Sequence, residues 1–480
     1  MDKYPVVCSG KTLKECMAII DKHAQGISFV LESGFLVGVL TDGDIRRALL
    51  NNSSLEDSVD SVMNRKFVSF HVGTESKIIR ESFNQRIRHI PLLDDKGSLV
   101  DVADPNGNFR ISVLKPSLTG NELSYVTECI ETSWISSQGK FVTQFEKSFE
   151  EFHSGSHALA VSNGTVALHL ALISLGVGPG DEVIVPNITF AASANAVIQA
   201  GASPVFCEIN PNTWCIEPNE IKRLVGPKTK AIMPVHLYGQ PCDMDSLNEI
   251  CAEFHLLMIE DCAEALGSEW KGRKVGTFGD AATFSFFGNK TISTGEGGMI
   301  LFNDSKVAQK AHILRDHGMS KNKRYWHEVV GYNYRLTNMQ AAIGVAQMEK
   351  FQEILTKKLK IASFYESAFE GSLGISNLPA TVKETLHSNW LFGVLLDKRI
   401  NVVDIISELL IRGIETRPFF HTLNAMPPYK DYRTSLTLEN SETISQRGLS
   451  LPSSVDLKEE ELQTISQNLI HIIREKIEKA

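Results

Sequence analysis

The sequence predicts an α/β protein with a mostly parallel central sheet and a smaller C-terminal lobe, preceded by a small α+β module. A chain of 480 residues is too long for one compact core. From Lys115 onward, helical patterns alternate with short apolar strands, which is typical of a parallel sheet. The N-terminal part instead contains a weak internal repeat of about 60 residues. We therefore predict three domains: 1–112, 113–355 and 356–480.

Both copies of the N-terminal repeat have the order helix, strand, turn, strand. The first copy predicts a helix over 12–23, strands over 27–31 and 35–40, and a helix over 41–50. The second predicts a helix near 76–86 and strands over 89–93 and 98–102. Turn residues separate the strands in each copy.

This arrangement resembles a tandem pair of CBS motifs, a regulatory module that typically binds adenosine nucleotides between its two halves. In that family a Thr-x-x-Asp at the end of the last strand contacts phosphate and ribose, and Thr41 and Asp44 match it. The second copy has Asp104–Gly107 at the equivalent place, so the resemblance implies at most one nucleotide site. Alternatively, Thr41 or Asp42 only caps the next helix, and the pair serves packing or assembly.

The larger part of the chain supplies short apolar segments that predict buried strands at 183–185, 231–235 and 256–259. In such sheets, ligands bind beyond the carboxyl ends of the strands, so reactive side chains are expected just after these segments. Beyond Thr356, amphipathic helices and a strand near 390–396 predict the smaller C-terminal lobe.

Composition excludes several classes of function. The net charge is −9 and the sequence pI about 5.9, so no basic surplus exists to bind nucleic acid. The chain start lacks the apolar core of a signal peptide and no later run could span a bilayer, so we expect no membrane association and a cytoplasmic location. The eight cysteines form no Cys-x-x-Cys pair, and we predict no metal site.

The stretch Thr283–Lys290, which runs into Gly295–Gly298, is the most informative segment of the chain. An apolar run predicts a strand that delivers Ser285 and Lys290 into a Gly-rich loop, where backbone can approach a ligand closely. This suits a lysine that forms a Schiff base with pyridoxal phosphate while a nearby hydroxyl holds the phosphate.

Three further segments supply the remaining parts of such a site. Gly164 and Thr165 open a helical run, where free amides and the helix dipole would cradle a phosphate. Asp261 follows a predicted strand and could pair with the pyridine nitrogen, and Glu264 could lie near the ring hydroxyl. Phe190, which also follows a predicted strand, could supply an aromatic face to the cofactor.

His236 also follows a predicted strand. It is as consistent with a structural histidine as with a site residue.

Residues from about 115 to 478 resemble the DegT/DnrJ/EryC1/StrS family of pyridoxal phosphate-dependent sugar aminotransferases, and in particular its branch that aminates GDP-linked sugars. The resemblance rests on these segments: Pro116–Gly120, Ser133–Ser137, Ser162–Leu172, Val235–Gly239, Glu260–Ala265, Phe284–Lys290, Tyr325–His327 and Gly331–Tyr334. It implies a type I aminotransferase fold that works as a homodimer with active sites shared between subunits.

Position by position, the resemblance implies a role for each candidate residue. Lys290 would form the Schiff base, and a related dehydratase branch has histidine there, so Lys290 favours amino transfer. Asn333 would reach the phosphate from the other subunit. The wider family often has glutamine at Glu264, whereas the GDP-sugar branch resembles this chain in having glutamate.

The implied reaction moves an amino group from L-glutamate to the C4 ketone of GDP-4-keto-6-deoxy-D-mannose, for O-antigen or other surface polysaccharide. A UDP- or dTDP-linked keto sugar is the alternative substrate. A different class of function is a further alternative: the chain could be a nucleotide-sensing protein whose aminotransferase part is an inactive scaffold. Enzymes of the GDP-sugar branch begin near the segment that is Lys115-Pro116 here, so the CBS-like pair is an addition.

Overall fold

The computed structural model describes residues 4–479 except 24, 73, 75–77, 80–81, 85–86, 95, 105–110, 321 and 378–381. The chain divides into two compact units. Unit 1 comprises 1–111 with 407–415, and unit 2 comprises 112–406 with 416–480. The boundary that we predict at residue 355 falls inside one helix of unit 2, and it stays a prediction.

Unit 1 contains two three-stranded sheets with the same topology. The first has β1 (Val6–Cys8), β2 (Ile27–Glu32) and β3 (Phe35–Thr41), with helices α1 (Leu13–His23), α2 (Asp42–Leu50) and a 3₁₀ turn at Val59–Ser61. The second has β4 (Phe70–His71), β5 (Ile90–Leu93) and β6 (Leu99–Ala103). In each sheet the first strand is parallel to the second and the second is antiparallel to the third. The predicted repeat is therefore present in the strands; the helix predicted near 76–86 lies largely outside the described residues.

The two sheets of unit 1 share an apolar core. Phe29 of β2 and Val102 of β6 are buried in one cluster. The backbone amide of Leu36 donates a 3.2 Å hydrogen bond to the carbonyl of Gly97, which joins the two hairpins. Neither copy buries its apolar face alone, which accounts for the duplication.

Unit 2 is built on a seven-stranded sheet in the order β7-β15-β14-β11-β10-β8-β9. Its strands are β7 (His157–Val161), β8 (Glu182–Pro186), β9 (Ser203–Cys207), β10 (Thr229–Ile232), β11 (Leu257–Asp261), β14 (Ala281–Ser285) and β15 (Gly298–Phe302). Strand β15 runs antiparallel to both β7 and β14, and the other described strand pairs are parallel, so the sheet is mostly parallel, as predicted. Strand β10 ends before the predicted position 235, because Pro234 has no amide to continue the ladder.

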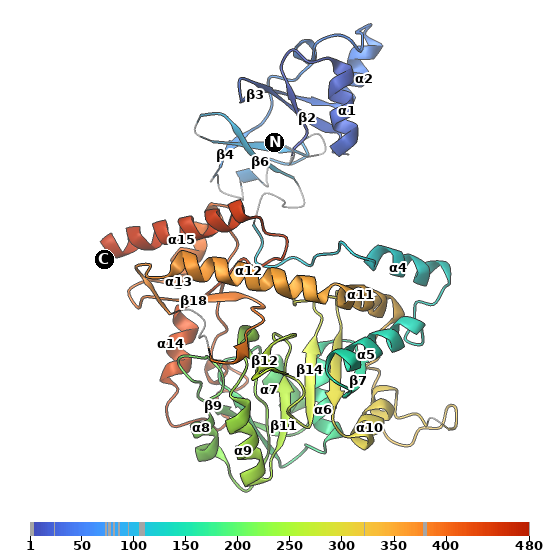
Figure 1. Ribbon diagram of the computed structural model, residues 1–480, viewed down its shortest axis with the longest axis vertical. Coiled ribbons are helices and arrows are strands. Elements are labelled where there is room, and N and C mark those ends of the chain that lie inside the picture. Colours follow the sequence, from blue (N-terminus) through green and yellow to red (C-terminus); the bar gives the residue numbers. More distant parts are fainter. Residues whose placement is uncertain are drawn as a thin grey trace. The chain divides into compact units, whose positions relative to one another are not determined.

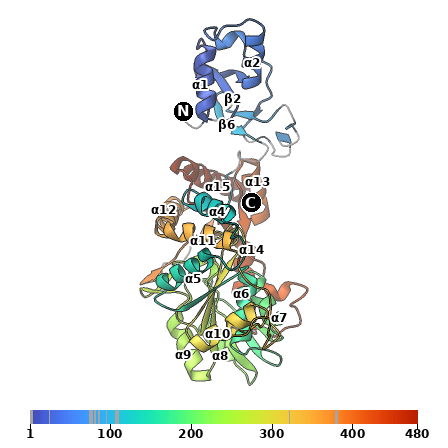
Figure 2. The ribbon, with the colours of Figure 1, turned by 90° about the vertical axis from the view of Figure 1, so that its right-hand side faces the viewer.

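Helices cover both faces of this sheet (Figures 1 and 2). They are α4 (Glu122–Glu131), α5 (Lys140–Phe152), α6 (Gly164–Ser174), α7 (Ala192–Gln199), α8 (Pro218–Leu224), α9 (Met244–Phe254), α10 (Ser305–Arg315) and α11 (Asn338–Glu349). Figure 2 shows α6 and α7 on one side of the sheet and α5 and α9 on the other. Ile259 and Ala281 pack in the α6 cluster, whereas Ala282 and Phe284 pack with α5. Since strand residues alternate between faces, Asp261, Thr283 and Ser285 belong to the α6 face.

The C-terminal part of unit 2 forms a second, antiparallel sheet in the order β16-β18-β20-β19. It contains β16 (Ile375–Asn377), β18 (Phe392–Leu396), β19 (Arg417–Pro418), β20 (Gly448–Leu451), and helices α12 (Phe351–Phe369), α14 (Glu439–Arg447) and α15 (Glu459–Lys479). Helix α13 (Val402–Ile411) begins in this part, and its residues from 407 onward belong to unit 1. A small sheet joins β12 (Glu269–Trp270), β13 (Arg273–Lys274) and β17 (Thr385–Leu386), and 3₁₀ turns span Leu237–Gly239 and Leu423–Ala425. Among the described residues, the helices are too short or too polar to cross a membrane.

Lys358 of α12 ties this C-terminal part together. It is buried, and its Nζ donates to the carbonyls of Trp390 at 2.8 Å and Ser453 at 2.7 Å. Burial lowers the pKa of Lys358 to about 7. One amine thereby holds the segment before β18 and the segment after β20, which lie at the same end of the antiparallel sheet.

Candidate active site

A cavity of about 910 Å³ opens in unit 2 at the carboxyl ends of β11 and β14, beside the N-terminus of α6. Its wall contains seven of the residues that the sequence predicts for a cofactor site: Gly164, Thr165, Phe190, Asp261, Glu264, Ser285 and Lys290. Asn333 does not line this cavity; it is exposed and pairs with Asp316 in an isolated antiparallel bridge. The parallel strands thus bring together segments that are more than a hundred residues apart.

The N-terminus of α6 and the end of β14 form an anion cradle. The Oδ1 atom of Asn163 accepts from the amide of Val166 at 3.0 Å and caps the helix. The amides of Gly164 and Thr165 have no intrahelical acceptor and are free to bind a phosphate. A Cβ on Gly164 would lie 2.8 Å from the Cβ of Ser285, so only glycine lets the helix approach the serine this closely.

Asp261 is buried at the end of β11 and is held by two hydrogen bonds. Its Oδ2 accepts from Ser193 Oγ at 2.8 Å, and its Oδ1 accepts from the amide of Ala263 at 3.1 Å. Ser193 Oγ also lies 3.1 Å from Thr189 Oγ1. Burial raises the pKa of Asp261, although the Ser193 hydrogen bond opposes this. A protonated pyridine nitrogen beside this carboxylate would favour its ionised form.

Lys290 and Glu264 form a buried pair in the same wall. Lys290 Nζ lies 3.7 Å from Glu264 Oε1, and Glu264 Oε2 accepts from the amide of Tyr238 at 2.8 Å. Burial lowers the pKa of Lys290 and raises that of Glu264 to about 7. A larger fraction of the lysine is therefore the neutral amine, which is the form that reacts with a carbonyl carbon.

Trp390 covers Lys290, a contact that the sequence did not predict. Lys290 Nζ lies 4.0 Å from the centroid of the indole ring, and Trp390 Nε1 donates to the carbonyl of Asn289 at 2.6 Å. The indole is stacked on Tyr238 at 6.0 Å between centroids. Trp390 comes from the C-terminal part of the unit. Local patterns in the sequence do not predict its contact with Lys290, because the two residues are far apart along the chain.

Phe190 lies at the rim of the cavity, where 59% of its surface is exposed. Its ring centroid is 6.0 Å from that of Phe420. An aromatic face is therefore available at this edge, and its stacking on a cofactor remains a prediction.

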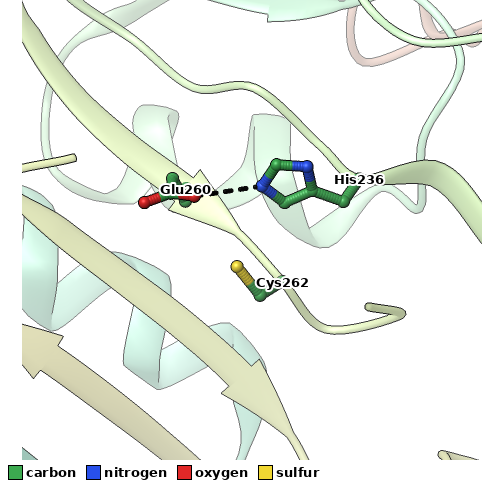
Figure 3. Close-up of side chains that lie close together, drawn as sticks. All are labelled: His236, Glu260 and Cys262. Carbon is green, nitrogen blue, oxygen red and sulfur yellow. Dashed lines mark hydrogen bonds and ion pairs between the residues drawn. The ribbon is translucent and has the colours of Figure 1, made fainter. Parts of the chain in front are cut away.

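His236 belongs to a buried structural network (Figure 3). Its Nδ1 accepts from the amide of Cys242 at 3.1 Å, so Nε2 carries the proton and donates to Glu260 Oε2 at 3.2 Å. Glu260 also accepts from three loop amides, Gly276, Phe278 and Gly279. Cys262 lies beside this pair, but both ring nitrogens of His236 are already engaged. The structural interpretation of His236 is the one that this geometry favours.

In unit 1, Thr41 and Asp44 form a reciprocal capping box at the start of α2. The Asp44 amide donates to Thr41 Oγ1 at 3.2 Å, while the Thr41 amide donates to Asp44 Oδ2 at 2.9 Å. Asp44 also pairs with Arg47 at 2.6 Å. The two residues therefore cap the helix in this structure, and a nucleotide-binding role remains a prediction.

The residues of the unit 2 cavity fit pyridoxal phosphate. The cradle between α6 and Ser285 suits the phosphate, Asp261 suits the ring nitrogen, and Lys290 offers a buried amine.

Comparison with known proteins agrees with this chemistry. The sequence profile of the DegT/DnrJ/EryC1/StrS aminotransferase family matches residues 116–470, and that of the CBS domain matches residues 1–51, which is the first predicted copy. GDP-perosamine synthase of Caulobacter vibrioides is 46% identical over 76% of this chain and 98% of its own length. GDP-perosamine synthase of Vibrio cholerae is 46% identical over 74% of this chain and 97% of its own.

Solved structures show the same fold. Helicobacter pylori PseC, an aminotransferase involved in the biosynthesis of pseudoaminic acid, superposes with a TM-score of 0.72 and 28% identity, covering 76% of this chain and 100% of that protein. Pyridoxal phosphate is the cofactor that the family membership implies, and the geometry of Lys290, Asp261 and Ser285 accommodates it. The chain belongs to the DegT/DnrJ/EryC1/StrS aminotransferase family.

Proposed function

We propose that this protein transfers the amino group of L-glutamate to the C4 ketone of GDP-4-keto-6-deoxy-D-mannose in the cytoplasm, giving GDP-perosamine for surface polysaccharide. The observation that carries this proposal is the convergence of Lys290, Asp261 and Ser285 in one cavity, in a chain 46% identical to two GDP-perosamine synthases. The products of the full cycle are 2-oxoglutarate and the amino sugar, so no external oxidant or reductant is needed.

When bound, pyridoxal phosphate carries the amino group between the two substrates and withdraws electrons from the reacting carbon. The protein's own residues do the rest. The α6 amides and Ser285 would hold the phosphate, and Asp261 would keep the ring nitrogen protonated. Ser193, which donates to Asp261 at 2.8 Å, fixes the orientation of that carboxylate.

Lys290 is the group that moves protons. With pyridoxal phosphate bound, its neutral Nζ would take the α-proton of glutamate and later deliver a proton to the sugar C4. The lowered pKa of Lys290 supports this role, because the amine must exchange a proton near neutral pH. Trp390 limits the path of the freed Nζ, since the indole lies 4.0 Å away and is anchored to the loop of Asn289.

A UDP- or dTDP-linked keto sugar is the second candidate substrate, because none of the cavity contacts described above reads a nucleobase. An inactive scaffold is disfavoured, since the lysine, the aspartate and the anion cradle are all in place.

Lys290→Ala is expected to lower turnover by at least about 10³-fold, because both the covalent attachment and the proton carrier are lost. The assay offers equal amounts of GDP-, UDP- and dTDP-4-keto-6-deoxy sugars with glutamate, and detects aminated products by mass spectrometry. Lys147→Ala, an exposed helical lysine, is the control. Full activity in the Lys290→Ala variant would reject the role assigned to Lys290. If only the UDP- or dTDP-linked sugar were aminated, that sugar and not the GDP-linked one would be the substrate.

Glu264→Gln is expected to flatten the pH dependence of stability in the cofactor-depleted protein. The folded pKa of Glu264 is about 7 against an ordinary 4.5, so the folded state holds a proton that the unfolded state releases. The proton held by Glu264 stabilises the folded state by at most about 3 kcal/mol. This stabilisation is fully present below pH 4.5 and is lost as the pH rises through 7. Thermal midpoints from pH 5 to 8 measure it. If the thermal midpoints of the wild type and of Glu264→Gln change with pH in the same way, Glu264 is ionised in the folded protein over this whole pH range.

We propose that the enzyme is a homodimer whose active sites are shared. Asn333 is exposed and outside its own cavity, and it follows a surface segment in which Tyr325 and Val330 are 76% and 92% exposed. Exposed apolar side chains of this kind are typical of interfaces.

Mixing inactive Lys290→Ala and Asn333→Asp subunits is expected to restore about a quarter of wild-type activity, because half of the dimers would be mixed and would carry one intact site. Each variant alone and a mixture made without subunit exchange are the controls. Activity equal to the average of the two parent proteins would place Asn333 outside a shared site.

We also propose that unit 1 binds an adenosine nucleotide near Thr41 and Asp44. Asp44→Asn keeps the helix cap but removes the charge, and is expected to weaken AMP or ATP binding about tenfold in calorimetric titration. Asp21→Asn on the exposed side of α1 is the control. Equal affinity in the two variants would leave Asp44 with its capping role alone.

A further inference from the structure

Two buried hydroxyls lead to Asp261 in the cavity wall. Ser193 Oγ donates to Asp261 Oδ2 at 2.8 Å, and Thr189 Oγ1 lies 3.1 Å from Ser193 Oγ. Thr189 and Ser193 are only 2% and 1% exposed. Within the described part of the chain, the Thr189 hydroxyl contacts Ser193 alone. It therefore bonds to the residue that orients the carboxylate.

These hydroxyls link two separate parts of the sheet edge. Thr189 lies in the connection between β8 and α7, and Ser193 lies in the first turn of α7, whereas Asp261 ends β11. Strand β10 stands between β8 and β11 in the sheet. The two hydrogen bonds thus join the β8–α7 connection to the end of β11 across one intervening strand.

Ser193 does not cap its own helix. Helix α7 has Ala191 as its N-cap residue and has no side-chain cap hydrogen bond. A serine in the first turn could bond to the helix backbone, but the hydroxyl of Ser193 bonds to Asp261 and Thr189 instead. The carboxylate of Asp261 consequently lies at the first turn of α7, where the positive end of the helix dipole favours its ionised form.

The direction of both hydrogen bonds follows from the number of protons. A hydroxyl has one proton to donate, and an ionised carboxylate can only accept. Since Ser193 donates its proton to Asp261, it must accept in its contact with Thr189, and Thr189 must donate. A hydroxyl that accepts one hydrogen bond becomes a stronger donor in the next, and burial strengthens both bonds.

We propose that Thr189 is a positioning residue that acts through Ser193 to hold the Asp261 carboxylate ionised against the ring nitrogen of pyridoxal phosphate. Without the Thr189 donor, Ser193 would stabilise the carboxylate less, and the shared proton would lie closer to Asp261 and farther from the ring nitrogen. A less protonated ring withdraws electrons less strongly from the reacting carbon. This inference rests on the proposed contact between Asp261 and the ring nitrogen, and it is independent of which sugar is aminated.

The test uses the full-length protein loaded with pyridoxal phosphate whose ring nitrogen is isotope-labelled, and it measures the NMR chemical shift of that nitrogen at neutral pH. Asp261→Asn is the reference for an unprotonated ring, and Ser193→Ala is expected to move the signal part of the way towards it. Thr189→Val keeps the size of the side chain but removes the donor, and should move the signal up to roughly a third as far as Ser193→Ala does. Thr189→Ser retains the hydroxyl and should match the wild type.

A double variant separates this chain of hydrogen bonds from other effects. If Thr189 acts through Ser193, Thr189→Val leaves the signal unchanged in a protein that already carries Ser193→Ala. Ser441→Ala is the matched control, because Ser441 is a buried serine that donates to a buried carboxylate, that of Glu208, and does not line the cavity. It should leave the signal at its wild-type position.

Three results would overturn the assignment. An unmoved signal in Thr189→Val would show that Thr189 only supports the fold. An equal movement with and without Ser193 would show that Thr189 acts by another route, such as its neighbour Phe190. A signal unmoved even in Asp261→Asn would refute the contact between Asp261 and the ring nitrogen, and with it the role of Thr189. Thr189→Ala removes the same donor and takes the place of Thr189→Val if valine impairs folding.

Discussion

The active site depends on one constraint, the parallel register between β11 and β14. This register sets Asp261 beside Thr283 and leaves Ser285 one step further along the same face. The N-terminus of α6 then reaches Ser285 only because residue 164 has no side chain. A slip of one residue would turn Asp261 and Ser285 to the α5 face, where phenylalanines fill the space. Apolar packing on the two faces is therefore what holds the polar site in place.

The polar groups of the cavity are costly to bury, and the protein offsets this cost in different ways. Asp261 receives a hydroxyl and an amide, whereas Glu264 receives an amide and a lysine at 3.7 Å. Lys290 gains contact with an indole face, which attracts cations. The result is a buried amine paired with a buried carboxylate, in which burial lowers the pKa of Lys290 and raises that of Glu264 to about 7. This arrangement is suited to proton exchange at neutral pH.

Local patterns in the sequence were sufficient to predict much of this site. Asp261, Ser285 and Lys290 each follow or end an apolar strand, and the rule that parallel strands present their carboxyl ends together placed them in one cavity. Trp390 could not be predicted in this way, because its contact with Lys290 depends on how the C-terminal sheet packs on the large one. The contact of Ser193 with Asp261 could not be predicted either, because a serine in the first turn of a helix most often caps that helix. For Thr41 the sequence left capping and nucleotide binding open; the capping box is present, and the second role is untested.

Trp390 is fixed at three points: its indole nitrogen bonds to Asn289, its ring faces Lys290, and its carbonyl accepts from Lys358. Rotation of the indole would break its contacts with Asn289 and Lys290, while the Lys358 contact fixes the backbone from which the side chain projects. Phe190 and Phe287, by contrast, are 59% and 48% exposed in the cavity wall. The two phenylalanines therefore form an exposed edge of the cavity, whereas the buried tryptophan forms a wall whose indole is held in place.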